Sequence, residues 1–420
     1  MLSKLIDELK TYNSIGIFGF GKEGRSFYDF ALKYLKDIQI VIIDKANGDN
    51  YLDDLKKVDL IIKSPGISLY KLGIEYNQYN FTSMSELFIR YFAKQIIGIT
   101  GTKGKSTLCT ILYNLFKNNN QDVKLCGNIG LPSFDILEEL ELDTVVVMEL
   151  SSHQLSNIKY SPHIAILTNI FDDHLDYYKS KFDYYDSKFN IFRYQSSDDI
   201  SIINCNTKCK KIVDNKKDIF HSTRVLDVTK DILKYQNKFN IKSGYIHLAT
   251  LQILEAIVDI NSIDKYIYQK TLNEFKTLHH RLEYVDKIDG IVFINDSIST
   301  IPEATIEAIN ILKDVNSVII GGYDRGIQYS DLVNFLLNSD VSNIILYSQT
   351  GLLIKKLFNK VNNKKTIYYT KDLKSAVVYA KDITKNDTIC LFSPAASSFD
   401  CFKNFEQRGE YFKTLVNNKI

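Results

Sequence analysis

A glycine-rich turn at residues 98–107, GITGTKGKST, carries the residues best suited to chemistry in this chain. It follows the strand-like run QIIGIT and precedes LCTILYNLFK, in which apolar residues recur at helical spacing. In that context backbone N–H groups and a helix N-terminus point at anionic oxygens, as a bound phosphate requires. We therefore predict that Lys105 binds phosphates and that Ser106 or Thr107 holds a magnesium ion. The general phosphate-loop pattern has glycine where Ile99 stands.

Acidic residues follow two further strand-like runs. The run TVVVME ends at Glu149, and HIAILTN leads into IFDDHLDYY, which contains Asp172, Asp173, His174 and Asp176. The carboxyl ends of neighbouring parallel strands meet at one edge of a sheet, so we expect both groups beside the glycine-rich turn. Because Mg²⁺ prefers carboxylate, phosphate and water oxygens, Glu149 is a candidate metal ligand. A strand-end cap and a polar N-capping turn are the structural alternatives.

Lys188 lies in KFDYYDSKFNIF, where Phe182, Tyr185, Phe189 and Phe192 recur at helical intervals. It falls at the margin of that apolar stripe, so its aliphatic stem would pack against protein. An amine that points inward is one interpretation. From spacing alone, the favoured interpretation is a surface lysine whose amine reaches solvent.

A second glycine pattern, GFGKEGRS, places Gly19, Gly21 and Gly24 after the strand-like run SIGIF, and Asp44 ends the run IQIVIID. This is the dinucleotide fingerprint, with glycines for a tight turn and a carboxylate for a ribose hydroxyl. Any ligand with a diphosphate and a ribose satisfies the same chemistry. The pattern alone therefore leaves open an NAD-dependent dehydrogenase, another nucleotide-binding module, or an enzyme for a different diphosphate.

These candidate residues need a scaffold of alternating strands and helices. Short β-branched runs alternate with helical patterns along the whole chain, among them IQIVIID, VDLIIKSPG, TVVVMEL, HIAILTN, SVIIGG, NIILYS and TICLFSPA. This alternation predicts an α/β protein with parallel sheets covered by helices. We expect three domains: a Rossmann-like domain at 1–93, a central P-loop ATPase-type domain at 94–278, and a Rossmann-like domain at 279–420.

Composition excludes several classes of partner. The chain has 420 residues, of which 52 are Lys or Arg and 50 are Asp or Glu, so its net charge of +2 argues against a nucleic-acid or anionic-membrane binder. No apolar run approaches the ~20 residues that cross a bilayer. The first residues lack the pattern of a signal peptide, so we expect a cytoplasmic protein. The six cysteines are sparse, and free thiols are favoured over a zinc site at Cys205 and Cys209.

Several motifs together carry a family resemblance. GTKGKST, GNIG at 127–130, ELSSHQL, DDHLD, HRLE and SPAASSFDCFKNFEQRGEYF occur in this order over nearly the whole chain, which resembles the Mur ligases of peptidoglycan synthesis. INDSIST, in place of a DYAH-like segment, favours the D-glutamate-adding branch. The resemblance implies that ATP activates UDP-MurNAc-L-alanine as an acyl phosphate, which glutamate then attacks. It also implies a role in cell wall biogenesis and cell division.

The resemblance gives the first domain a UDP-linked substrate instead of NAD. The implied contacts there are Gly19, Gly21 and Gly24 near the diphosphate, Asp44 and Lys45 near the uracil, and Ser64, Pro65 and Gly66 on a neighbouring loop. In the central domain, Asn128, Ser151 and His174 would lie along the same substrate.

The resemblance also implies an ATP site with two Mg²⁺ ions. ATP would contact Gly101, Thr102, Gly104, Lys105, Ser106, Thr107, Arg281 and Asp296. The implied metal ligands are Ser106, Glu149, His174 and Lys188, and the implied catalytic residues are Lys105, His174 and Lys188. Lys188 matches a family lysine that CO₂ converts to a carbamate, which reverses the interpretation drawn from spacing.

The third domain would bind glutamate through Thr300, Arg325, Ser398 and Phe405. The chain has Ile298 where the family commonly has a lysine, so the glutamate carboxylates would depend more on Arg325, whose planar fork grips a carboxylate at two points. L-glutamate in place of D-glutamate, or a folylpolyglutamate-type ligase, are the alternatives. We expect small-molecule substrates only and a monomer.

Overall fold

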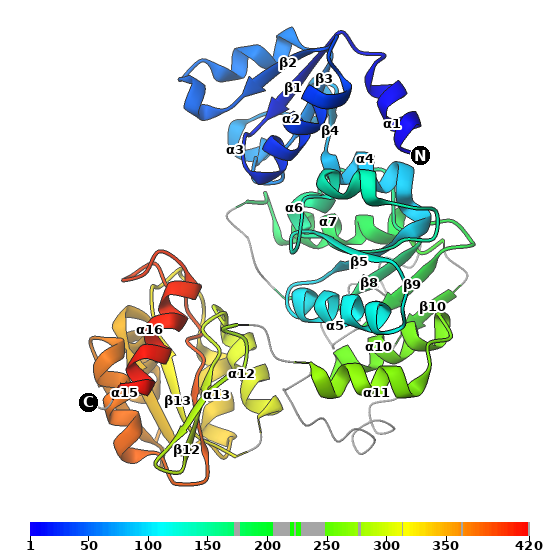
Figure 1. Ribbon diagram of the computed structural model, residues 1–420. Coiled ribbons are helices and arrows are strands. Elements are labelled where there is room, and N and C mark those ends of the chain that lie inside the picture. Colours follow the sequence, from blue (N-terminus) through cyan, green and yellow to red (C-terminus); the bar gives the residue numbers. More distant parts are fainter. Residues whose placement is uncertain are drawn as a thin grey trace. The chain divides into compact units, whose positions relative to one another are not determined.

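A computed structural model describes residues 1–171, 177–204, 219–221, 224–227, 248–275, 279–312, 314–362 and 364–418. The chain forms two compact units, one of residues 1–239 with 248–272 and one of residues 240–247 with 273–420. The first unit contains two sheets and the second unit contains one (Figure 1).

The first sheet has the strand order β2-β1-β3-β4, and its pairs are all parallel. Its strands are β1 (Ser14–Phe18), β2 (Gln39–Ile43), β3 (Leu60–Lys63) and β4 (Phe81–Thr82). Its helices are α1 (Leu2–Leu9), α2 (Lys22–Tyr34) and α3 (Leu69–Leu72). Strand β1 is buried along its whole length, so the turn that follows it starts from the centre of the sheet.

The second sheet has the order β10-β9-β8-β5-β7-β6, again with parallel pairs. Its strands are β5 (Ile96–Thr100), β6 (Val123–Gly127), β7 (Val145–Glu149), β8 (Ile164–Leu167), β9 (Ile200–Ile203) and β10 (Arg224–Asp227). The accompanying helices are α4 (Met84–Phe92), α5 (Lys105–Asn118), α6 (Ser152–Leu155), α7 (Lys181–Arg193), α10 (Leu248–Ile260) and α11 (Lys265–Glu274). Because β5 lies between β7 and β8, the carboxyl ends of these three strands meet at one edge.

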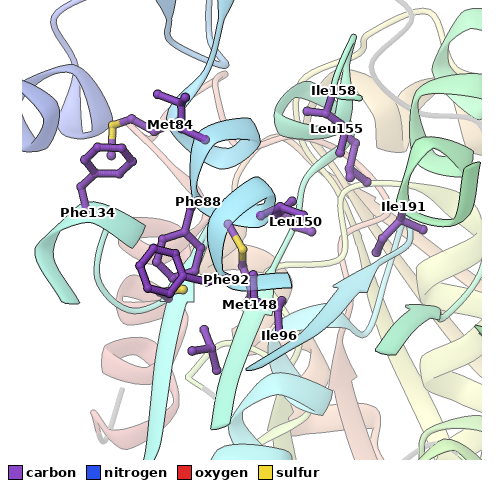
Figure 2. Packing of buried hydrophobic residues seen from close by; sticks show 14 of the residues in the cluster. Met84, Phe88, Phe92, Ile96, Phe134, Met148, Leu150, Leu155, Ile158 and Ile191 are labelled. Carbon is purple, nitrogen blue, oxygen red and sulfur yellow. The ribbon is translucent and has the colours of Figure 1, made fainter. Parts of the chain in front are cut away.

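One hydrophobic core runs through both sheets of the first unit. Met84, Phe88 and Phe92 of α4 pack among residues that include Phe134 and Met148 of the second-sheet region (Figure 2). Burying each such side chain contributes about 1.5–3 kcal/mol. The predicted boundary at residue 93 follows α4 directly and stays a prediction, as does the boundary at 278, which lies outside the described residues.

The third sheet, in the second unit, has the order β11-β12-β16-β13-β14-β15. Its strands are β11 (Glu283–Ile288), β12 (Ile291–Asn295), β13 (Val315–Gly321), β14 (Asn343–Tyr347), β15 (Thr366–Thr370) and β16 (Ile389–Phe392). Its helices are α12 (Pro302–Ile311), α13 (Ser330–Asn338), α14 (Ser348–Phe358), α15 (Leu373–Ile383) and α16 (Phe405–Asn417). Only β11 pairs antiparallel, through a two-residue turn at Asp289 and Gly290 that both have positive φ.

The predicted α/β class with parallel sheets is confirmed, and the antiparallel edge strand β11 is the exception that alternation did not predict. Within the described ranges, no helix combines the length and apolar character needed to span a bilayer.

Candidate functional site

The glycine-rich turn after β5 has a backbone that only glycine adopts without strain. Gly101 has φ +148°, and a Cβ there would lie 2.0 Å from the Thr168 Oγ1. Gly104 has φ +81° and precedes the first residue of α5. The strand, turn and helix that the sequence predicted are therefore present, with the helix N-terminus at the end of the turn.

Residues at the end of β8 hold this turn in place. The Thr102 N–H donates to the Asn169 backbone oxygen (3.0 Å), and the Lys103 N–H donates to the Asn169 Oδ1 (2.8 Å). The Thr168 hydroxyl donates to the Lys103 carbonyl (2.7 Å). The first N–H groups of an α-helix have no acceptor within the helix, and such a helix N-terminus is suited to bind an anion.

Two lysine amines converge on one carbonyl of the turn. The Lys105 Nζ donates to the carbonyls of Gly101 (2.9 Å) and Thr102 (3.1 Å), and the Lys188 Nζ donates to the Gly101 carbonyl (2.9 Å). Lys188 is 2% exposed, and its amine lies 4.9 Å from the centre of the Tyr184 ring. The interpretation of Lys188 as a surface lysine, drawn from helical spacing, was wrong: the side chain points inward to the turn.

Glu149 ends β7 beside the turn, because Ile99 and Glu149 pair in register. Its side chain is buried, and its Oε1 accepts a hydrogen bond from the Asn128 Nδ2 (2.9 Å). Its Oε2 and the Thr107 Oγ1 are buried without a hydrogen-bond partner among the described residues. Two unsatisfied oxygens, on residues that end β7 and begin α5, fit a hard cation such as Mg²⁺, so the chemistry of the donor set is compatible with the predicted metal site.

The GNIG segment, residues 127–130, packs against the end of β7 and forms hydrogen bonds with it. Gly127 has φ +100°, and a Cβ there would lie 2.2 Å from the Glu149 carbonyl oxygen. The Asn128 N–H donates to that same oxygen (2.9 Å). Asn128 thus contacts Glu149 through both backbone and side chain. Ser151, which was also predicted to contact the substrate, is the N-cap of α6, and its hydroxyl accepts a hydrogen bond from the Gln154 N–H (3.2 Å).

The predicted acidic cluster at 172–176, with His174, lies outside the described residues. Among the described ranges, no three His, Cys, Asp or Glu side chains gather closely enough to hold a metal ion by themselves. Ser106, another of the predicted metal ligands, lies in the first turn of α5 and is half-buried.

The first glycine turn is held by a carboxylate. The Asp44 Oδ2 accepts from the Phe20 N–H (2.7 Å), and its Oδ1 accepts from the Ala46 N–H (3.0 Å). These hydrogen bonds, that of Ala46 foremost, hold the pKa of Asp44 below its usual value. Gly24 has no room for a side chain, since a Cβ would lie 2.3 Å from the Gly19 oxygen. Lys45, which follows Asp44 in the chain, is exposed.

The neighbouring loop follows Lys63, a buried residue that the sequence analysis missed. Ser64 donates from its hydroxyl to the Gly19 carbonyl (2.6 Å), and Pro65 and Gly66 follow. Lys63, at the end of β3, is buried, and its Nζ donates to the carbonyls of Ser64 (3.1 Å) and Ile67 (3.0 Å). Burial lowers the pKa of Lys63 to about 8. A lysine directly after the apolar run DLII was the signal that could have identified it.

In the second unit, the predicted ATP contact Asp296 is buried after β12. Its Oδ2 accepts from the hydroxyls of Ser299 (2.5 Å) and Ser393 (2.8 Å), and its Oδ1 accepts from the Leu282 N–H (3.2 Å). Burial raises its pKa to about 6, and the nearby charge of Arg281 opposes that rise. The assignment of Asp296 and Arg281 to an ATP site stays a prediction.

Arg408 is a second residue that sequence reasoning missed. It is 0% exposed, and its guanidinium donates to the carbonyls of Ser297 (2.7 Å) and Ala396 (2.9 Å). It thereby joins the loop after β12 to the loop after β16. Its position in FEQRGEYF gave no signal of burial, because charged residues in an amphipathic helix usually face solvent.

The predicted glutamate contacts are spread over these loops. Ser398 is buried after β16, and Phe405 begins α16, where its carbonyl accepts from the Ser297 hydroxyl (2.8 Å). Thr300 is half-buried, and Arg325 is exposed on the loop after β13. The loops after β12 and β16 are thus brought together through Ser297.

Comparisons with known proteins give the same family as the motifs. Residues 99–262 match the model of the Mur ligase middle domain. The chain is 31% identical over 458 residues to the UDP-N-acetylmuramoylalanine–D-glutamate ligase of Clostridium botulinum strain Langeland, covering 99% of this chain and 98% of that one. A MurF ligase from Thermotoga maritima in complex with ADP has a TM-score of 0.59 at 18% identity, over 97% of this chain and 95% of the other. A bifunctional folylpolyglutamate/dihydrofolate synthase of Yersinia pestis has a TM-score of 0.55 at 12% identity, over 83% of this chain and 97% of the other.

Proposed function

This chain belongs to the Mur ligase family, and we propose that it joins D-glutamate to UDP-MurNAc-L-alanine at the expense of ATP in peptidoglycan precursor synthesis. The observation that carries the proposal is the near full-length similarity to a ligase of that name. The geometry of the turn at Gly101–Gly104 supports the ATP-dependent part of the reaction.

The reaction has to turn a carboxylate, which is a poor electrophile, into one that an amine can attack. Transfer of the ATP γ-phosphoryl group to the alanine carboxylate gives an acyl phosphate and ADP. The glutamate amine then adds to the acyl carbon, and the tetrahedral intermediate expels phosphate as the amide forms. The positive charge of Lys105 and the first N–H groups of α5 would stabilise the phosphoryl oxygens as their charge develops.

Magnesium, when bound, would neutralise phosphate oxygens at this site. Glu149 through its unsatisfied Oε2, together with Ser106 or Thr107, would hold it, and His174 belongs to the same proposal. We also propose two ions and a carbamate on Lys188, in which the amine nitrogen bonds to the carbon of CO₂ and loses a proton. The buried position of the Lys188 amine against the Gly101 carbonyl supports this placement.

The substrates would divide among the three predicted domains, 1–93, 94–278 and 279–420. The UDP group would lie against Gly19, Gly21, Gly24, Asp44, Lys45 and the loop of Ser64, Pro65 and Gly66, with Asn128 and Ser151 further along the substrate. Arg281 and Asp296 would meet ATP, and Thr300, Arg325, Ser398 and Phe405 would bind glutamate. We propose that the enzyme acts as a monomer in the cytoplasm, where ATP and UDP-linked precursors are present.

The experiment is phosphate release from ATP by the purified chain, with Mg²⁺ and bicarbonate present. We expect release only when UDP-MurNAc-L-alanine and D-glutamate are both added, together with one equivalent of amide product by mass spectrometry. L-glutamate is the matched control, and we expect it to support less than about a hundredth of the rate, since a mirror-image substrate cannot pair both carboxylates with the same groups. Equal rates with both enantiomers, or release that depends on a folate substrate, would contradict the proposal.

A further inference from the structure

The loop of residues 64–68, called here the Ser64–Ser68 loop, leaves β3 of the first sheet beside the Gly19 turn. The Ser64 hydroxyl bonds the Gly19 carbonyl, and the Lys63 amine bonds the carbonyls of Ser64 and Ile67. These contacts hold the loop from its own sheet. None of these hydrogen bonds involves Pro65, in the outer part of the loop.

Tyr177 supplies that contact from the second sheet's part of the unit. Its hydroxyl lies 2.8 Å from the Pro65 carbonyl oxygen and 2.8 Å from that of Ile67, so its one proton lies between two acceptors. In return, the Ser68 hydroxyl donates to the Tyr177 backbone carbonyl (2.8 Å). The loop and Tyr177 are therefore fixed to each other in both directions.

Packed rings extend from Tyr177 toward the phosphate-binding turn. The Tyr177 ring lies against His153, with centroids 3.9 Å apart, and against Tyr178 (4.9 Å). Tyr178 in turn contacts Tyr184 (5.6 Å), whose hydroxyl is 2.9 Å from the Thr102 Oγ1. Every step is a direct contact between described side chains, and the last one reaches the turn that holds Lys105.

We propose that Tyr177 is a positioning residue that fixes the Ser64–Ser68 loop relative to the phosphate-binding turn, so that a substrate held at the loop presents its carboxylate correctly to ATP. This rests on the proposed function, which places the diphosphate of the substrate at the loop. In sequence, Tyr177 directly follows the acidic segment 172–176.

The inference is specific because the sheets themselves do not depend on Tyr177. The shared core around Met84, Phe88 and Phe92 joins the two sheets of this unit independently (Figure 2). Loss of one hydroxyl would therefore remove the bonds to the Pro65 and Ile67 carbonyls and loosen the outer part of the loop without separating the sheets. Binding of each nucleotide alone would persist, and the alignment of the two substrates would be lost.

The test is Tyr177→Phe, which removes the hydroxyl and keeps the ring against His153. We expect kcat to fall about tenfold, as for a displacement of the reacting groups by a fraction of an ångström. The KM for ATP and the affinity for UDP alone should stay within about twofold of the wild type, because neither requires the alignment. The matched control is Tyr76→Phe, since the Tyr76 hydroxyl bonds the Phe81 carbonyl (3.1 Å) within the first sheet. The control should leave kcat unchanged.

An unchanged kcat in Tyr177→Phe would overturn the inference, and so would a fall in kcat accompanied by an equal loss of ATP binding. A second readout does not need catalysis: amide hydrogen exchange at residues 64–68 should be faster in Tyr177→Phe than in the wild type. If the wild type shows no ligase activity, the proposed function fails, but hydrogen exchange still tests whether the Tyr177 hydroxyl holds the Ser64–Ser68 loop. Equal exchange in the two proteins would then overturn it.

Discussion

The two glycine-rich turns of the first unit share one plan and are held by opposite charges. Each follows the first strand of its sheet in the chain, and each is followed by a helix whose first residue is a lysine, Lys22 in α2 and Lys105 in α5. In the first turn the Asp44 carboxylate accepts a hydrogen bond from a backbone N–H. In the second turn two lysine amines donate hydrogen bonds to a backbone carbonyl.

The difference decides what each turn can do for a phosphate. The Gly19 carbonyl is bonded by the neutral Ser64 hydroxyl, whereas the Gly101 carbonyl receives both Lys105 and Lys188. Lys105 therefore supplies a positive charge where phosphoryl transfer would develop negative charge, also when Lys188 is a carbamate, and the first turn offers mainly a fixed shape. We infer that the first turn binds and the second turn catalyses.

The largest expected effect comes from exchanging the two equivalent lysines for alanine. Lys105→Ala should lower kcat by about a thousandfold or more, because it removes a charge placed at the phosphoryl group. Lys22→Ala should change kcat by less than about twofold, since its exposed amine only bonds the Gly130 carbonyl (2.9 Å). The measurement is steady-state phosphate release. Comparable losses in the two variants would show that the turns do not differ in this way.

Lys188 gives the next effect. Lys188→Ala should lower kcat by at least about a hundredfold, because the variant loses a buried charged group at the turn. If the amine acts as a carbamate, short-chain carboxylic acids should restore part of the activity of this variant and none of the activity of Lys105→Ala. Full activity of Lys188→Ala at saturating Mg²⁺ would remove the residue from the site.

Replacing one glycine of each turn by alanine should destabilise the two turns to different extents, because only one of the two glycines has a strained backbone. Gly101→Ala places a Cβ at φ +148° and 2.0 Å from the Thr168 Oγ1, so we expect unfolding to become easier by about 2 kcal/mol and ATP binding to weaken. Gly21, with φ −77°, has open space around it, and Gly21→Ala should alter stability by less than about 0.5 kcal/mol. Urea unfolding and ATP titration check both. A tolerant Gly101 would mean that the turn is not rigid.

Much of this architecture could be predicted because it depends on local pattern. The runs of β1, β3, β5, β7 and β8 are mostly apolar and mostly buried, and the glycine turns directly follow β1 and β5. The short or edge strands β4, β6 and β15 were not among the predicted runs. In β6 and β15, polar and partly exposed residues interrupt the apolar pattern, as is usual for a strand with only one neighbour.

Two residues that the sequence analysis missed, and Lys188, whose burial helical spacing alone did not predict, share a different cause. Lys63, Lys188 and Arg408 are buried cations whose partners include backbone carbonyls of loops. A carbonyl carries no side-chain identity, so nothing in the sequence marks it as the partner of a distant lysine or arginine. Helical spacing places Lys188 at the margin of an apolar stripe, and only the packing of α7 against the turn directs its amine inward.

The smallest effect concerns the carboxylate that holds the first turn. Asp44→Asn should lower the free energy of unfolding at pH 7 by about 0.5–1 kcal/mol, because an amide cannot accept from both the Phe20 and Ala46 N–H groups. The hydrogen bonds lower the folded-state pKa, so this stabilisation is present above the ordinary pKa of 3.8 and is lost as the pH falls through the folded value. Asp53→Asn, an exposed site in the same sheet region, is the control.

The KM for the UDP-linked substrate should rise about threefold in Asp44→Asn with kcat unchanged, since a turn that only binds contributes equally to the ground state and the transition state. Urea unfolding at pH 7 and at pH values below 3.8 measures the stability difference between the two proteins, which should narrow as the pH falls through the lowered pKa of Asp44. If kcat fell instead of the KM rising, the first turn would take part in aligning the reacting groups, and the division between a binding turn and a catalytic turn would no longer hold.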